Sequence, residues 1–185
     1  MSRPDAALTT GTVATPRPEA WLRGPVGGVP PLLMPVAHAL IQAGEELQEA
    51  VEGLSVEETW TRPGGAASIA FHLRHIVGSL DRLLTYARGE QLDPTQRDAL
   101  RREREVRVPA ATASELAAQV DGAIVRAIAV LRHTADASLL EPRAVGRLRL
   151  PTTVLGLLSH AADHTRRHTG QVIATARILR GTRPS

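Results

Sequence analysis

Apolar residues recur at helical spacing in four long segments of the chain, separated by stretches rich in glycine, proline and charge. The segments cover about residues 32–51, 68–88, 112–132 and 151–180. In each segment, apolar positions three or four apart form one stripe along a helix. Four amphipathic helices of this length are typical of an all-α antiparallel four-helix bundle, and no segment alternates for long enough to predict a strand.

Capping residues mark where two of the helical segments begin. Ser55 and Glu58 have the Ser-x-x-Glu spacing of a capping box and open a short helical turn that contains Trp60. Thr112 and Glu115 have the same relation at the start of the third long helix. Each pair satisfies backbone N–H groups that the first helical turn leaves without partners, so these boundaries follow from local sequence.

The chain is long enough for one domain, which we place at residues 19–181. Residues 1–18 are rich in Pro, Thr and Ala and predict a disordered tail, and the stretch that follows them predicts an arm along the bundle. Two connections are expected to lack regular structure: the charged segment 90–109 and the loop 141–151.

The composition restricts the chemistry and the location. With no cysteine, the chain excludes disulfides, cysteine-ligated zinc and a cysteine nucleophile, so a metal site must use His, Asp or Glu. Any thiol chemistry must use a thiol from outside the protein. No segment is apolar enough to span a membrane and the start does not resemble a secretory signal, so we expect a cytoplasmic protein without a membrane partner.

A specific nucleic-acid partner is not expected, although the calculated pI is about 10.7. All the basic residues are arginines, which stay charged to high pH, and the net charge is only +3. Glu103 and Glu105 interrupt the densest arginine group, which contains Arg101, Arg102, Arg104 and Arg107. Aromatic residues make up 2% of the chain, too few for a surface on which bases stack.

Histidines supply the candidate chemistry. On the fourth helix His160, His164 and His168 are four residues apart, and a helical wheel turns the last two toward the apolar stripe. The second helix carries His72 and His75 on one flank, and spacing alone does not choose between them. Two histidines from one helix and one from another can hold a divalent ion and leave a coordination position open. The alternative is that they are ordinary surface or hydrogen-bonded histidines without a metal.

Three segments resemble the DinB/YfiT-like family of metal-binding four-helix bundles (the DNA-damage-inducible DinB, not the polymerase of that name). They are the stretch from Leu54 to Trp60 followed by Arg62-Pro63-Gly64, the stretch Phe71-His72-Leu73-Arg74-His75-Ile76, and the stretch His164-Thr165-Arg166-Arg167-His168-Thr169-Gly170-Gln171. The last is similar to the family's His-x-x-x-His-x-Gly-Gln ending.

The resemblance implies one divalent ion, Zn, Ni or Fe, bound by His75, His164 and His168, with His72 as the alternative ligand from the second helix. Gln171 is then either a hydrogen-bond partner of a ligand or simply part of the next helical turn. The family also implies a small-molecule substrate and a link to stress responses, and a homodimer is an open alternative to a monomer.

The reaction that the resemblance favours is transfer of an external low-molecular-weight thiol, such as mycothiol, bacillithiol or glutathione, activated by the metal. Arg74, Arg143 and Arg147 are candidates to bind a substrate carboxylate. One alternative is hydrolysis by a metal-activated water, with Asp81 or Asp163 as base. Another is a non-catalytic stress or interaction protein whose metal is structural.

Overall fold

The structure is a computed structural model that describes residues 17–106 and 109–183. The tail predicted over residues 1–18 therefore lies almost wholly outside the described residues. In the described part, no helix is both long enough and apolar enough to cross a membrane.

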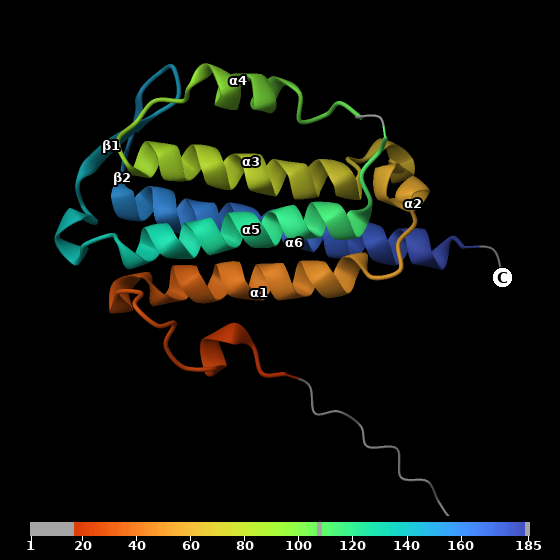
Figure 1. Cartoon of the computed structure of the whole chain (residues 1–185), viewed down its shortest axis with the longest axis horizontal. Coiled ribbons are helices and arrows are strands. Elements are labelled where there is room, and N and C mark those ends of the chain that lie inside the picture. Colours follow the sequence, from red (N-terminus) through yellow and green to blue (C-terminus); the bar gives the residue numbers. More distant parts are fainter. Residues whose placement is uncertain (1–16, 107–108, 184–185) are drawn as a thin grey trace, which may run out of the picture.

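Four long helices form the predicted bundle (Figure 1). They are α1 (Met34–Val51), α3 (Ile69–Ala87), α5 (Ala113–Arg132) and α6 (Val154–Gly181). Helix α6 packs against α1 and α3, and α5 packs against the same two, so α1 lies diagonally opposite α3. In Figure 1, α1 and α6 run in one direction while α3 and α5 run in the other. The bundle thus consists of two parallel pairs, each antiparallel to the other.

The predicted capping boxes are both present. The Ser55 backbone N–H donates to Glu58 Oε2 at 2.8 Å, and the Glu58 N–H donates to Ser55 Oγ at 3.1 Å, opening α2 (Val56–Trp60). Thr112 and Glu115 form the same reciprocal pair at the start of α5. The described residues also form 3₁₀ helices of three residues each: η1 (Ala20–Leu22), η2 (Pro31–Leu33), η3 (Pro63–Gly65) and η4 (Asp136–Ser138).

Both connections contain regular structure that the sequence pattern did not predict. Helix α4 (Pro94–Arg101) forms within the charged connection, where Asp93 and Gln96 make a further capping box. The loop before α6 is an antiparallel hairpin of β1 (Pro142–Val145) and β2 (Leu150–Thr153). Helix α4 and the chain after it cross back along the length of the bundle, which is why α5 can run parallel to α3 (Figure 1).

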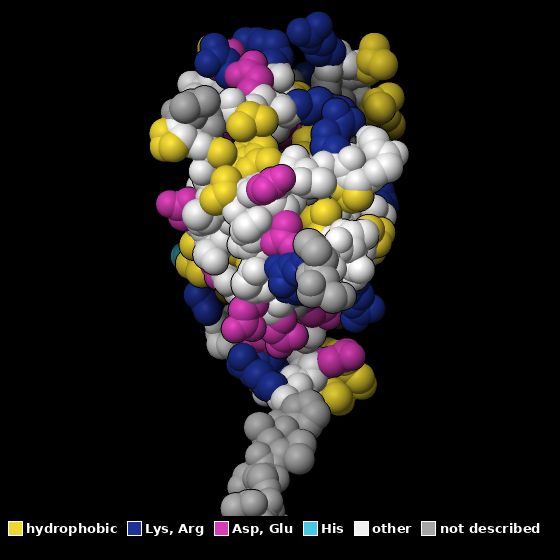
Figure 2. Space-filling view, turned by 90° about the vertical axis from the view of Figure 1, so that its right-hand side faces the viewer, with side chains coloured by type: hydrophobic (Ala, Val, Ile, Leu, Met, Phe, Trp, Pro, Cys, Tyr) yellow, Lys and Arg dark blue, Asp and Glu magenta, His cyan; other side chains and the backbone are white. Residues whose placement is uncertain are grey.

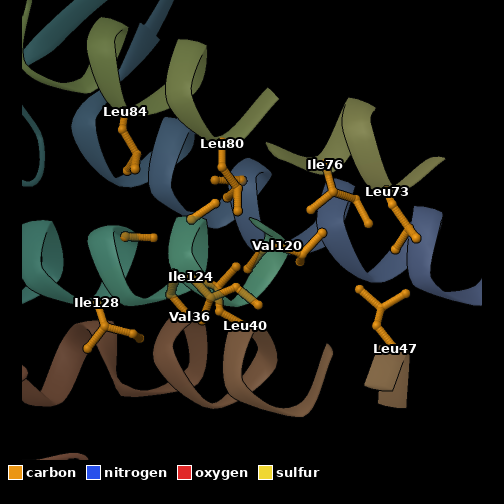
Figure 3. Close-up of a cluster of buried hydrophobic side chains, with 14 of the residues drawn as sticks. Val36, Leu40, Leu47, Leu73, Ile76, Leu80, Leu84, Val120, Ile124 and Ile128 are labelled. Atoms are coloured by element: carbon orange, nitrogen blue, oxygen red, sulfur yellow. The ribbon is translucent and has the colours of Figure 1, made fainter. Parts of the chain in front are cut away.

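The core lies between the four long helices. Figure 3 shows Leu73, Ile76 and Leu80 of α3 extending toward Leu40 of α1 and Val120 of α5. All five side chains are at most 1% exposed. Burying them removes apolar surface from water, which is the main favourable term in folding. The core therefore fixes the rotation of α3 and α6 and, with it, the direction in which their histidines point.

The segment before α1 packs on the bundle, as the sequence predicts for the arm. The Ala20 backbone N–H donates to Gln42 Oε1 at 2.8 Å, and Arg23 makes a bidentate ion pair with Glu45 at 2.8 and 2.7 Å. On the end of the molecule in Figure 2, acidic and basic side chains are interspersed with apolar and neutral ones. That face does not present one sign of charge.

Candidate metal centre

Three histidines from two neighbouring helices converge on one point. His75 comes from α3, and His164 and His168 come from successive turns of α6, which packs against α3. Each residue offers one ring nitrogen, and the three nitrogens lie within 4.8 Å of one another. The structure thus brings together the same three residues that the motif resemblance implies as ligands.

The spacing of these nitrogens suits a single ion. His75 Nε2 and His164 Nε2 are 2.9 Å apart. Two imidazole nitrogens bound to one zinc ion at about 2.1 Å lie about 3.0–3.4 Å apart, so small ring rotations would accommodate an ion. His164 Nε2 is the nitrogen that faces His75, and Nδ1, across the same ring, is buried without a hydrogen-bond partner in the described structure.

His164 and His168 are held in the neutral form that binds metals. Burial, followed by the neighbouring His75, lowers the pKa of His164 to about 4. The same two causes, in the same order, lower the pKa of His168 to about 4. An imidazole must lose its second proton before it can coordinate, so at neutral pH neither ring has to release one.

His72 lies beside His168 and outside the convergent group of three histidines. It is 7% exposed, and its Nδ1 is 2.9 Å from His168 Nδ1. Burial, and then His75, lowers the pKa of His72, which favours a neutral ring that can accept a hydrogen bond. This position suits a partner that orients His168, while His75 lies among the convergent nitrogens.

The carboxylate of Glu103 contacts the site. The sequence pattern indicates this residue only as an interruption of the arginine group. Glu103 Oε2 accepts from His75 Nδ1 at 2.7 Å, and Glu103 Oε1 accepts from Arg82 at 2.5 Å. Burial alone would raise the pKa of Glu103, but the hydrogen bonds from His75 and Arg82 outweigh it, and the pKa is lowered. The carboxylate is therefore ionised at neutral pH.

A cavity of about 240 Å³ opens beside two of the three histidines. It is lined by His75, Ser79, Arg82, Leu83, Tyr86, Leu92, Leu100, His160 and His164. A second cavity, of about 320 Å³, is lined by Glu103 but by none of the histidines. Only the first cavity would give a small molecule access to an ion held by His75 and His164.

Several other residues proposed from the sequence have different surroundings. Gln171 is exposed, and in the described structure no hydrogen bond joins it to a histidine. Two other histidines lie away from the convergent group: His38 contacts the Gly24 carbonyl, and His133 contacts the Ala129 carbonyl.

The candidate substrate-binding arginines are engaged elsewhere. Arg74 donates to the carbonyls of Arg102 and Glu105, and Arg143 donates to the Ala87 carbonyl and to Glu141. Arg147 is exposed in the turn between β1 and β2. None of the three lines the cavity beside the histidines.

The candidate bases also lie outside this cavity. Asp163 is exposed and pairs with Arg167 at 2.7 Å. Asp81 accepts from Gln96 at 2.7 Å. Both contacts are those of ordinary helix-surface carboxylates.

Comparison with known proteins gives the fold and the family. A conserved protein from Enterococcus faecalis matches with a TM-score of 0.62 and 19% identity, covering 81% of this chain and 98% of its own. YfiT from Bacillus subtilis, described as a probable metal-dependent hydrolase with an unusual four-helix bundle topology, matches with a TM-score of 0.60 and 16% identity, covering 78% and 86%. No curated protein matches the sequence. The family model of the DinB superfamily matches residues 39–172, from the first long helix into the last, and the chain therefore belongs to that superfamily.

Proposed function

We propose that the chain is a metal-dependent enzyme in which His75, His164 and His168 hold one divalent ion that activates a low-molecular-weight thiol for transfer to a small substrate. The observation that carries this proposal is the convergence of three ring nitrogens within 4.8 Å beside a cavity. Three protein ligands with an open side are the pattern of catalytic rather than structural zinc sites. Imidazole ligands suit zinc, nickel and iron.

The chemistry of the bound ion would be to lower the pKa of a coordinated thiol, which makes a nucleophile at neutral pH. The chain's own residues have simpler tasks. His164 and His168 are neutral and ready to bind, and His72 holds the ring of His168 in place. Leu83, Leu92 and Leu100 give the cavity an apolar wall for the body of a substrate. Because the chain has no cysteine, the thiol would come from outside.

Hydrolysis by an activated water is the second candidate. It is favoured by the likeness in fold to YfiT, which is described as a probable metal-dependent hydrolase. The exposed Asp81 and Asp163 are poorly placed as bases, whereas His160 lines the cavity and its ring centroid is 5.5 Å from that of His164. A purely structural metal is less well supported, because a structural site normally has a closed ligand shell.

Cobalt-loaded protein separates these possibilities. We expect glutathione, bacillithiol or mycothiol to produce a saturable sulfur-to-cobalt absorption band in the wild type but not in His168→Ala. His133→Ala, which changes a histidine away from the site, should behave as the wild type. If no thiol alters the spectrum and the loaded protein cleaves esters without a thiol, hydrolysis replaces thiol transfer. A spectrum insensitive to thiols, azide and cyanide alike would indicate a closed, structural site.

A further inference from the structure

Glu103 is the one carboxylate buried among the residues that the structure describes. Its exposed fraction is 7%, and burying a charge is unfavourable unless partners compensate for it. The partners here are two cationic or proton-donating groups of α3, Arg82 and His75. Most residues of the connection around Glu103 are exposed. Folding of that connection alone therefore gives no reason to bury a charged side chain at this position.

The two oxygens of Glu103 are divided between these partners in a way that determines the state of His75. Since Oε2 accepts from His75 Nδ1 at 2.7 Å, the ring carries its proton on Nδ1. The other nitrogen, Nε2, then has a lone pair and faces His164 Nε2 at 2.9 Å. The hydrogen bond therefore selects the tautomer in which His75 presents a ligand atom to the convergent group.

The surface of α3 is hollowed where the carboxylate lies. A Cβ atom at Gly78 would be 2.5 Å from Glu103 Oε1 and 2.7 Å from Arg82 Nη1. Glycine inside a helix costs about 1 kcal/mol relative to alanine, so local propensity does not favour it here. His75, Gly78 and Arg82 follow one another at helical spacing, so the pair of Glu103 and Arg82 lies across the helix directly over Gly78.

The connection between α3 and α5, in which Glu103 lies, is held against α3 on both sides of that residue. Arg74 donates to the carbonyl of Arg102 at 2.8 Å and to that of Glu105. The guanidinium of Arg104 lies 5.0 Å from the centre of the Phe71 ring, which stacks on His75 with centroids 5.4 Å apart. Residues 102–105 thus contact α3 around the His75 ring.

From these contacts we infer that Glu103 is the positioning residue of the metal centre: it holds His75 as the Nδ1-protonated tautomer and aims Nε2 at the ion. This inference rests on the proposed metal site and deepens it. Carboxylates that accept from the second nitrogen of a ligating histidine fix its orientation and raise its basicity, and removing them typically lowers metal affinity about 10- to 100-fold.

The test compares Glu103→Ala and Glu103→Gln with Glu105→Gln, which removes the same charge from an exposed neighbour. The tautomer of His75 is measured in metal-free protein by long-range ¹H–¹⁵N NMR, and Zn²⁺ affinity by competition with a chelator. We expect Glu103→Ala to mix the tautomers and to weaken Zn²⁺ binding by about 10- to 100-fold. Glu103→Gln, whose amide oxygen can still accept, should retain the tautomer and recover part of the affinity. Glu105→Gln should match the wild type.

Arg82 would be left buried without its partner in the Glu103 variants, and this alone could unfold them. The double variant Glu103→Gln with Arg82→Gln removes both charges and is measured in the same way. An unchanged His75 tautomer in Glu103→Ala overturns the inference, whatever happens to the affinity. If the wild type binds none of Zn²⁺, Ni²⁺ and Fe²⁺, the proposed function fails, and the metal-free tautomer measurement still decides whether Glu103 positions His75.

Discussion

Alanine at position 78 should destabilise the metal-free protein, although glycine-to-alanine changes inside helices normally stabilise. Helix propensity alone predicts a gain of about 1 kcal/mol. However, the new Cβ would lie 2.5 Å from Glu103 Oε1 and 2.7 Å from Arg82 Nη1, so the pair must move. Loss of a buried hydrogen bond between charged groups costs about 1.5–3 kcal/mol. The net expectation for Gly78→Ala is a loss of about 0.5–2 kcal/mol, the difference between these two terms.

Gly170→Ala is the matched control for this change. Gly170 also lies inside a long helix, but a Cβ atom added there would meet no heavy atom within 4 Å. This variant should gain the full propensity term of about 1 kcal/mol. Urea denaturation of both variants with a chelator present, at about pH 7.5, measures the two free energies of unfolding. If Gly78→Ala stabilises the protein as much as Gly170→Ala, then Glu103 and Arg82 do not occupy the space over Gly78.

Three further predictions concern the histidines and the surface. The pKa values of His164 and His168, lowered to about 4 from an ordinary 6.5, mean that only the unfolded chain takes up these protons as the pH falls below 6.5. The metal-free fold should therefore lose stability between about pH 6.5 and 5, and equal urea midpoints at the two pH values would contradict this. His75→Ala should abolish metal binding, whereas His72→Ala should weaken it about 10-fold, and equilibrium dialysis giving the reverse order would exchange their roles. The protein should not bind nucleic acid specifically, and sub-micromolar, sequence-dependent anisotropy changes at about 150 mM salt would overturn that expectation.

The bundle could be predicted from the sequence because its signals are local. Apolar spacing gives the four long helices, and capping pairs such as Ser55 with Glu58 set where helices begin. The Asp93 and Gln96 pair, with Pro94 between them, carries the same local signal for α4, but the apolar stripe there is too weak to indicate a helix. The arrangement of the helices as two parallel pairs could not be predicted, since it depends on the path that the connection between α3 and α5 takes along the bundle.

The candidate site was only partly predictable for the same reason. His164 and His168 share a helix face, so their pairing follows from helical geometry. The choice between His72 and His75 depends on the rotation of α3 in the bundle, which the whole core determines. Glu103 is distant in sequence from His75 and meets it only because the connection after α4 returns over α3. The neighbouring sequence shows only an acidic residue among arginines, which does not identify Glu103 as part of the site.

Elemental analysis of protein purified without a polyhistidine tag or added metal tests the central claim most directly. Wild type should contain about one divalent ion per chain, as should His133→Ala, while His164→Ala and His168→Ala should contain almost none, because two imidazoles bind an ion far more weakly than three. Circular dichroism of each variant shows whether the bundle has remained folded. Equal metal content in all four proteins, or none in the folded wild type even after addition of zinc, nickel or iron, would contradict the account.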